Sequence, residues 1–493
     1  MSNLWIRKPL AQLESEALDS EKGLKRTLGA GSLVALGVGG IIGAGLFVRT
    51  AAAAANAAGP AVTLGFVIAA IGCAFAGLCY AELASMIPIA GSAYTYAYAT
   101  LGELIAWIIG WDLVLEYALG AATVGIAWSE YLNKFLGLFG TSVPYAFCHS
   151  PFQTDPVTGA HGIMNVSALF IVFVLTLLLI RGMRESAVVN GIIVAVKVTI
   201  VVLIIALGWK FINPANHTPY IPAPTEYTDK EGVTHAFGGT MGILGAAGIV
   251  FFAFIGFDAV STAAQEAKNP KRDMPIGILG SLVVCTVLYV LFSHVLTGLA
   301  PVEFFRTTGS EASVAQAIDV AMPGYKWLSS AVTIAILGGF SSVILVLLMG
   351  QSRVFYSMSH DGLVPKAFAQ LHPKYQTPYK SNWLFFVFVG FFAAFVPGDI
   401  VGDMTSIGTL FAFVIVSIGT WIMRVKEPGA PRPFRAPAVP VVSTLGALVC
   451  GAMILGLGWP NWVRLGVWLA IGLVFYAVYG RKHSRLQNKA ASA

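Results

Sequence analysis

Apolar runs long enough to cross a bilayer recur along this chain from residue 30 to residue 480. A transmembrane helix needs about 20 such residues, because the hydrocarbon core of a bilayer is about 30 Å thick. Only 11% of the 493 residues are charged, whereas a soluble domain carries about 25%. An open sheet would leave backbone groups without partners in lipid, and the runs do not alternate as barrel strands do. We therefore predict an all-α polytopic membrane protein.

The charged residues between the runs predict its topology. We divide the chain into about 12 transmembrane helices, at 30–50, 62–87, 103–136, 163–180, 187–209, 241–265, 276–299, 327–358, 382–397, 403–424, 438–458 and 462–480. An even number places both termini on one side. If that side is the cytoplasm, the inner segments hold 22 of the 30 Lys and Arg residues. The positive-inside rule then predicts a cytoplasmic-membrane protein with both termini in the cytoplasm, and topology explains the basic excess without a nucleic-acid partner.

Two of the predicted spans contain features that weaken a helix. The stretch GVGGIIGAGLFVRT (37–50) holds five glycines in its first nine positions, and each costs a helix interior about 1 kcal/mol relative to alanine. In span six, FFAFIGFDAVSTAAQEAKNP (251–270) carries Gly256 two residues before Asp258. Non-helical backbone at membrane depth is tolerated only where it lines a cavity or is buried in protein. We therefore predict that helices one and six are discontinuous.

The two breaks occupy matching places in the chain. Spans one to five (30–211) and spans six to ten (241–424) form two halves, and an odd number of spans per half inverts one relative to the other. Two further spans (438–480) follow, with tails at 1–29 and 481–493 in the cytoplasm. Paired, interrupted helices in inverted repeats are typical of the binding site of a secondary transporter. Freed amides and half-helix N-termini can hold a carboxylate, and freed carbonyls can hold an ammonium, so an amino acid suits both.

Several motifs resemble a known family. They are GGIIGAGLFV (39–48), PIAGSAYTYAY (88–98), GWDLVLEY (110–117), VVNGIIVAVKV (188–198), FFAFIGFDAVSTAAQEAKNPKRDMP (251–275), SRVFYSMSHDGLVP (352–365) and RPFRAPAVP (432–440). In this order and at this spacing they resemble the amino acid–polyamine–organocation superfamily, specifically the bacterial twelve-span members of its cationic amino acid transporter branch. The resemblance implies the five-plus-five inverted-repeat fold of the leucine-transporter type, with two additional C-terminal helices.

The resemblance also implies the substrate-binding residues. The substrate carboxylate is expected at the amides around Gly43, Ala44 and Gly45. The substrate ammonium is expected at the carbonyls of Ile41, Phe252, Ala253 and Ile255, with the Phe252 ring closing over the substrate from outside. Many relatives have Ser or Thr where this chain has Ala44, so a side-chain hydrogen bond is not expected there. In span eight, Ser341 and its neighbours are expected to line the pocket.

Four ionisable residues stand out inside the predicted spans, where a charge is costly and marks a functional site. Lys197 lies at mid-span, where the family pattern puts its ammonium in place of the sodium ion of sodium-coupled relatives. Glu116 matches the family glutamate that faces the substrate. It could bind a basic side chain, carry a proton or bond hydroxyl groups, and the alternative is a structural pairing with Lys197 or another span. Asp112, one helical turn earlier, is expected to be structural. Asp258 is expected to cap the second half of helix six.

Other classes of function fit the sequence less well. A membrane-embedded enzyme would need a nucleophile and base or a metal-ligand set, and the eight histidines show no ligand spacing, so no metal or cofactor is expected. A channel filter and a nucleotide-binding domain are not recognisable either. We expect a proton-coupled, sodium-independent secondary transporter that carries cationic and/or small neutral L-amino acids by alternating access, with amino acid exchange as the alternative. A small membrane partner subunit is left open.

Overall fold

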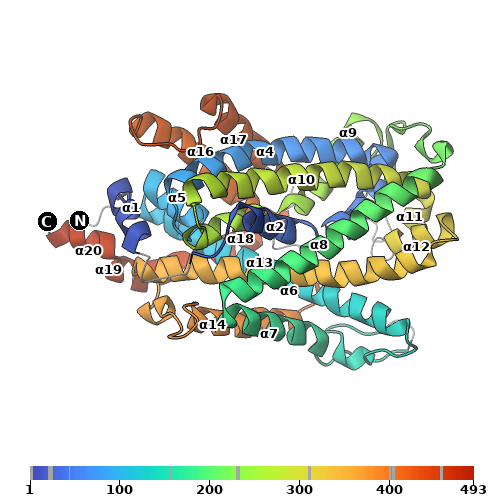
Figure 1. The fold of residues 1–493 in the computed structure, drawn as a ribbon, viewed down its shortest axis with the longest axis horizontal. Helices are drawn as coiled ribbons and strands as arrows, with labels where there is room; N and C mark the ends of the chain where they lie inside the picture. Colours follow the sequence, from blue (N-terminus) through green and yellow to red (C-terminus); the bar gives the residue numbers. More distant parts are fainter. Residues whose placement is uncertain are drawn as a thin grey trace.

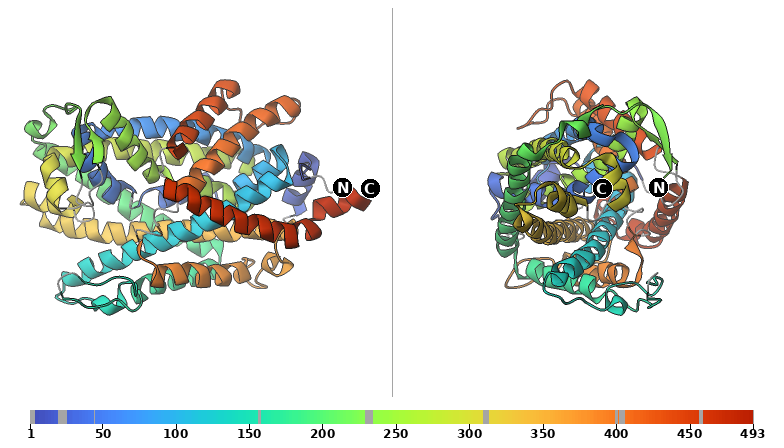
Figure 2. Two further views of the ribbon diagram at one scale, coloured as in Figure 1. Left: turned by 180° about the vertical axis from the view of Figure 1, so that it is seen from behind. Right: turned by 90° about the vertical axis from the view of Figure 1, so that its right-hand side faces the viewer.

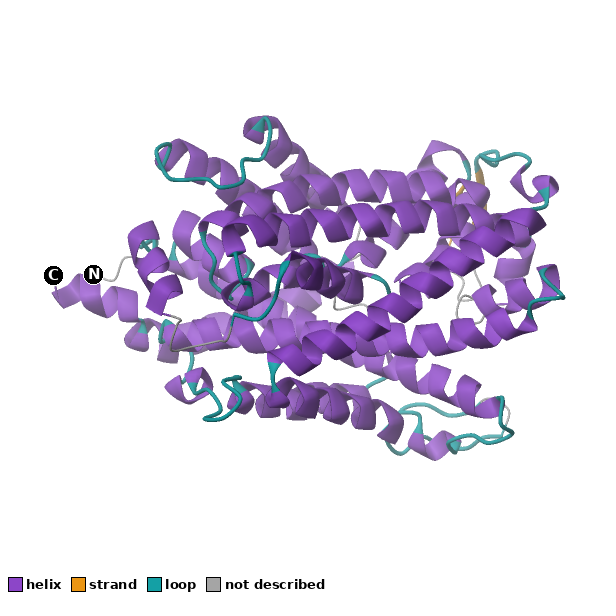
Figure 3. Ribbon diagram, in the orientation of Figure 1, coloured by secondary structure: helices purple, strands orange, loops and turns teal. Residues whose placement is uncertain are grey.

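The computed structural model describes residues 4–19, 26–43, 45–155, 158–228, 234–308, 313–398, 401, 406–455 and 459–492. The described chain is almost entirely helical, as Figure 3 shows, with one small pair of antiparallel strands, β1 (Thr225–Thr228) and β2 (Thr234–Phe237). The helices are α1 (Leu10–Asp19), α2 (Ala30–Ile41), α3 (Thr50–Ala53), α4 (Val62–Met86), α5 (Ala93–Thr100), α6 (Glu103–Gly137), α7 (Val166–Arg181), α8 (Met183–Gly208), α9 (Gly239–Phe251), α10 (Pro270–Leu299), α11 (Val302–Thr308), α12 (Ser313–Ala321), α13 (Lys326–His360), α14 (Tyr379–Phe395), α16 (Ser406–Lys426), α17 (Val439–Leu455), α18 (Trp459–Phe475), α19 (Arg481–His483) and α20 (Arg485–Ser492).

These helices lie on the apolar runs of the sequence. Seven helical stretches are long and apolar enough to cross a membrane, and five shorter apolar helices accompany them. Apolar helices of this kind are typical of surroundings of protein or lipid rather than water. The prediction of an all-α polytopic membrane protein is confirmed. The count of 12 crossings and the inverted repeat stay predictions.

The two longest single helices form the centre of the bundle. α6 and α13 are 35 residues each, and they make the most extensive helix–helix contact in the molecule. Figure 1 shows α4 and α10 running side by side on one flank and α7 beside α14 on the other. α17 packs on α16 at the periphery, and the end-on view in Figure 2 shows the remaining helices arranged around the centre. α1 and α20 lie at the same end of the bundle.

Both predicted interruptions are present. α2 ends at Ile41, Ile42 is extended with ψ 103°, and a π-helical segment starts at Gly45. α9 ends at Phe251 and is followed by short 3-10 turns. Gly256, with φ +117°, then turns the chain into a 3-10 helix over Asp258–Glu266. Only glycine adopts this positive φ without strain, so Gly256 determines where the second break lies.

A buried ion pair ties the second half of the broken span to α13. The Arg353 Nη2 donates to Glu266 Oε1 at 2.9 Å, and the two side chains are 0% and 1% exposed. Removing one partner of such a pair leaves an uncompensated charge in a dry environment, which costs about 3–5 kcal/mol. The pair therefore holds the segment that carries the second break.

We expect Arg353→Met to lower the free energy of unfolding by about 3–5 kcal/mol, because Glu266 would stay buried without its cation. Thermal unfolding of the purified protein in detergent measures this change. The control is Glu303→Gln, whose carboxylate is 72% exposed beside Arg306 and should change stability by less than about 1 kcal/mol. Equal melting temperatures of Arg353→Met and the wild type would contradict the structural role of the pair.

Candidate substrate site at the two breaks

The two breaks lie directly against each other. A Cβ built on Gly256 would come within 2.8 Å of the Gly40 carbonyl oxygen, and one built on Gly45 would come within 2.3 Å of the Ala253 Cα. No side chain fits at such distances, so the glycines are what allows the two backbones to touch. The sequence breaks both helices at the depth where they meet, which leaves their unpaired backbone groups in one place.

Tyr289 of α10 connects the two breaks through its hydroxyl group. The Tyr289 Oη lies 2.9 Å from the carbonyl oxygen of Ile41 and 2.9 Å from that of Ala253. A hydroxyl group has one proton, so it can satisfy only one of the two acceptors fully at a time. The other carbonyl keeps capacity for a second donor. Both carbonyls belong to the set expected to face a substrate ammonium.

Lys197 of α8 reaches the first break from the opposite side. Its buried ammonium donates to the carbonyl oxygens of Gly39 at 2.9 Å and Ile42 at 2.7 Å, and lies 3.4 Å from Ser342 Oγ of α13. These three contacts use the three protons of the ammonium. Asn190, two helical turns before Lys197, accepts from Ser342 at 2.7 Å and joins the same polar cluster. The cluster thus satisfies backbone carbonyls that the end of α2 leaves open.

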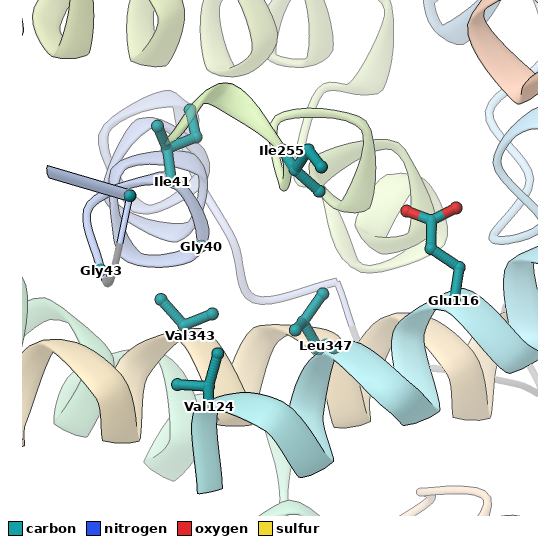
Figure 4. Close-up of a pocket in the computed structure, with 10 residues that line it drawn as sticks. Gly40, Ile41, Gly43, Glu116, Val124, Ile255, Val343 and Leu347 are labelled. Carbon is teal, nitrogen blue, oxygen red and sulfur yellow. The ribbon is translucent and has the colours of Figure 1, made fainter. Parts of the chain in front are cut away.

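A small pocket of about 30 Å³ lies between the breaks, α6 and α13. This volume corresponds to about two water molecules, so the pocket is narrow in this conformation. It is lined by Gly40, Ile41, Gly43, Gly45, Glu116, Gly120, Val124, Ile255, Val343 and Leu347. Figure 4 shows Val124, Val343 and Leu347 gathered across from Ile41 and Ile255. Glu116 is the only charged residue of this lining, so one wall is backbone, one is aliphatic, and one end is a carboxylate.

The Glu116 side chain is buried at that end, with 2% of its surface exposed. One carboxylate oxygen, Oε1, accepts a hydrogen bond from the Thr409 hydroxyl of α16. The other, Oε2, has no hydrogen-bond partner among the described residues. Glu116 also lines a second hollow on its far side, together with Asp112 and Arg464. It therefore stands between the pocket and a further polar space.

The two other acidic candidates point elsewhere. Asp112 is buried beside Gly408 of α16 and does not line the pocket. Asp258 is the first residue of the 3-10 helix, and its Oδ2 accepts from the Tyr117 hydroxyl of α6 at 2.5 Å. Its expected role as a helix cap stays a prediction. Asp258 thus links helix six to α6 beneath the pocket.

The remaining candidates fall partly outside the site or outside the described residues. Ser341 Oγ donates to the Leu337 carbonyl of its own helix, and the pocket is lined instead by Val343 and Leu347. Successive residues turn by about 100° on a helix, so Ser341 points away from the face that Val343 and Leu347 share. Ala44 and the Phe252 side chain lie outside the described residues, and their expected roles stay predictions.

Comparison with known proteins identifies the family. The family model described as amino acid permease matches residues 28–479. The chain belongs to the amino acid permease family. It is 45% identical to the branched-chain amino acid permease of Bacillus subtilis (strain 168), over 99% of this chain and 100% of that protein. It is 38% identical to the methylthioribose transporter of the same organism, with the same coverage, and 34% identical to the vacuolar cationic amino acid transporter 4 of Arabidopsis thaliana, over 87% of this chain and 69% of that protein. The protein is therefore a membrane transporter and not an enzyme.

Three groups in the site of this permease were not found by sequence reasoning. Tyr289 is a hydroxyl-bearing residue inside an apolar span, which is a usable signal because a buried hydroxyl needs a partner. Asn190 lies seven residues before Lys197, a spacing that places both on one helical face. Thr409 carries no local signal, because only the packing of α16 on α6 brings its hydroxyl to Glu116.

Proposed function

We propose that this permease carries neutral L-amino acids with aliphatic side chains across the cytoplasmic membrane, driven by protons and independent of sodium. The observation that carries the proposal is the pocket itself, which combines backbone groups of two broken helices with an aliphatic wall. Alternating access would then work by movement of two inverted halves around this fixed site. The excess of Lys and Arg in the predicted inner segments supports cytoplasmic termini.

The lining favours an apolar substrate side chain. Val124, Val343 and Leu347 face the space across from the breaks, and burying an aliphatic side chain there contributes about 25 cal/mol per Å² of apolar area. A cationic side chain would have to pair with Glu116, the one carboxylate of this lining, and would then compete with the proton that we assign to that group. The Bacillus subtilis relative is named for branched-chain amino acids, which agrees with this interpretation. Of the two classes expected from sequence, we therefore favour the neutral one.

The position of Lys197 supports independence from sodium. Its ammonium already bonds the carbonyl oxygens of Gly39 and Ile42. A sodium ion bound at the first break would need these same oxygens and would meet a fixed positive charge of like sign. The Lys197 side chain therefore occupies the place at the first break that a sodium ion would take.

The position of Glu116 supports proton coupling. It is the only charged group lining the pocket, and it also lines the hollow that contains Asp112 and Arg464. A buried carboxylate between two spaces can take up a proton from one side and release it to the other as access alternates. Amino acid exchange without proton movement is the alternative that this role of Glu116 argues against.

Uptake into proteoliposomes tests the proposal. Purified protein is reconstituted without sodium, and labelled leucine, alanine and arginine are supplied with and without an inside-alkaline pH gradient. We expect leucine to accumulate above its equilibrium level only with the gradient, and arginine to enter at least tenfold more slowly. Unlabelled methylthioribose serves as a competitor, because a relative carries it. Uptake that requires preloaded amino acid and ignores the gradient would replace symport by exchange.

The variant Glu116→Gln distinguishes a role of Glu116 in proton coupling from a role in substrate binding. The amide keeps the shape of the side chain but cannot take up a proton near neutral pH. We expect gradient-driven leucine accumulation to be lost at least tenfold, while exchange of external for internal leucine continues. Glu130→Gln, on the same helix but outside the pocket lining, is the matched control and should accumulate leucine normally. Full accumulation by Glu116→Gln would remove the proton role of Glu116.

A further inference from the structure

A basic hollow lies between α16 and α17, remote from the substrate pocket. It has a volume of about 490 Å³ and is lined by Trp421, Arg424, Val425, Pro428, Arg432, Arg435, Ala438, Val439 and Pro440. Three arginines and no acidic residue face this space. Glu82 of α4 lies behind it and pairs with Arg424 at 2.7 Å and Arg432 at 3.3 Å. One carboxylate faces three guanidinium groups, so the net charge of the cluster is positive. The opposite charges of the neighbouring Lys426 and Glu427 cancel.

The arginines differ in what they are used for. Arg432 is almost fully buried, and its two terminal nitrogens donate hydrogen bonds to four backbone carbonyl oxygens of the surrounding turn. Arg424 binds Glu82 in a bidentate manner, and its Nη1 makes no hydrogen bond to a described residue. Arg435 is exposed and has no hydrogen bond or ion pair within the described part of the chain. Arg432 therefore builds the turn, whereas Arg435 and one edge of Arg424 are open to a ligand.

The backbone adds to the positive field of this hollow. α17 begins at Val439, and its first residues, Val439 and Pro440, are part of the lining. The N-terminus of a helix carries about half a positive charge and favours an anion, above all a phosphate group. The arginines and the helix end thus converge on one space that suits a phosphate-sized anion.

An apolar surface continues from the hollow along both helices. On α16 the exposed Trp421 and Val425 lie at its mouth, and on α17 Val441, Leu445 and Leu448 are exposed along one face. In a polytopic membrane protein such faces meet acyl chains, and Trp at this place is typical of the level of the headgroups. A free phosphate would use only the arginines, whereas a phospholipid would use the arginines and the apolar face together.

We propose that this hollow binds the headgroup of an anionic glycerophospholipid, with the phosphate between Arg424 and Arg435 and the acyl chains along α16 and α17. The binding is independent of the transport proposal, because the hollow shares no residue with the substrate pocket. One basic residue near an anionic lipid contributes about 1 kcal/mol, or about fivefold in affinity.

Native mass spectrometry of the full chain, released from a neutral detergent, tests this site. Dioleoyl phosphatidylglycerol is titrated against dioleoyl phosphatidylcholine, which has the same chains and no net charge. We expect the anionic lipid to bind at least fivefold more tightly, Arg435→Gln to reduce that preference about fivefold, and Arg435→Lys to retain it. Lys366→Gln removes the same charge from an exposed position outside the lining and should leave the preference unchanged.

Two results would overturn the proposal. One is an equal loss of preference in Arg435→Gln and Lys366→Gln, which would show a general charge effect without a site. The other is displacement of phosphatidylglycerol by an equal concentration of glycerol phosphate, which would show that the headgroup anion alone is bound. Because Arg435 has no partner within the described chain, Arg435→Gln and Arg435→Lys are both expected to unfold at the wild-type temperature.

Discussion

Replacement of Lys197 by methionine is expected to reduce leucine uptake to the level of empty liposomes. The ammonium supplies the donor for the carbonyl oxygens of Gly39 and Ile42 at the end of α2. A buried acceptor that loses its donor costs about 1–3 kcal/mol, so two of them cost about 2–6 kcal/mol at the break that the substrate is proposed to use. Methionine keeps the length of the side chain and removes the charge, which isolates the contribution of the ammonium.

Uptake and thermal unfolding are measured together for this variant. Lys210→Met, at an exposed position directly after the same predicted span, controls for loss of a positive charge and should transport normally. A lower melting temperature with abolished uptake would agree with a fixed cation that organises the first break. Uptake at the wild-type rate by Lys197→Met would contradict this role.

Replacement of Gly45 by alanine is expected to reduce uptake at least tenfold and to lower the melting temperature. The added Cβ would meet the Ala253 Cα at 2.3 Å and its nitrogen at 3.1 Å, and backbone atoms cannot rotate away as a side chain can. The two half-helices must then separate, which moves the carbonyl groups of both breaks. We expect Gly256→Ala to behave in the same way, since its φ of +117° is also strained for any side chain.

Gly248→Ala is the matched control for both glycine variants. It lies on α9, in the same predicted span as Gly256, and a Cβ there meets nothing within 4 Å. Alanine is the better helix former by about 1 kcal/mol, so this variant should be as stable as the wild type or more so. Equal losses in Gly248→Ala and Gly45→Ala would show that the loss is unrelated to contact between the breaks.

Much of this fold could be predicted from the sequence because lipid imposes few solutions. Apolar runs must be helices in a bilayer, so the helix locations followed from composition alone. The positions of the breaks followed from Gly43, Gly45 and Gly256, because glycines lower the stability of a helix inside a membrane span. The intramembrane position of Lys197 followed from counting along its span, and its contact with α2 was expected only through the family resemblance.

The side chains of the pocket could not be predicted in the same way. Which face of α13 lines the site depends on the rotation of that helix, and Val343 rather than Ser341 faces the space. The partner of Glu116 depends on the packing of α16, whose Thr409 lies 293 residues away in sequence. Tyr289 reaches both breaks only because α10 packs against α2. Local patterns determine where helices begin and end, whereas these contacts arise from tertiary packing.

Binding of labelled leucine to the purified protein, compared with binding to Val343→Phe, tests most directly whether the pocket between the breaks is the substrate site. Phenylalanine would fill the space across from Gly43, whereas Ile334→Phe adds similar volume at a position on the same helix that is 50% exposed. We expect saturable binding by the wild type and by Ile334→Phe, and at least a tenfold loss of affinity in Val343→Phe. Unchanged affinity in a folded Val343→Phe protein would place the substrate elsewhere and contradict this account.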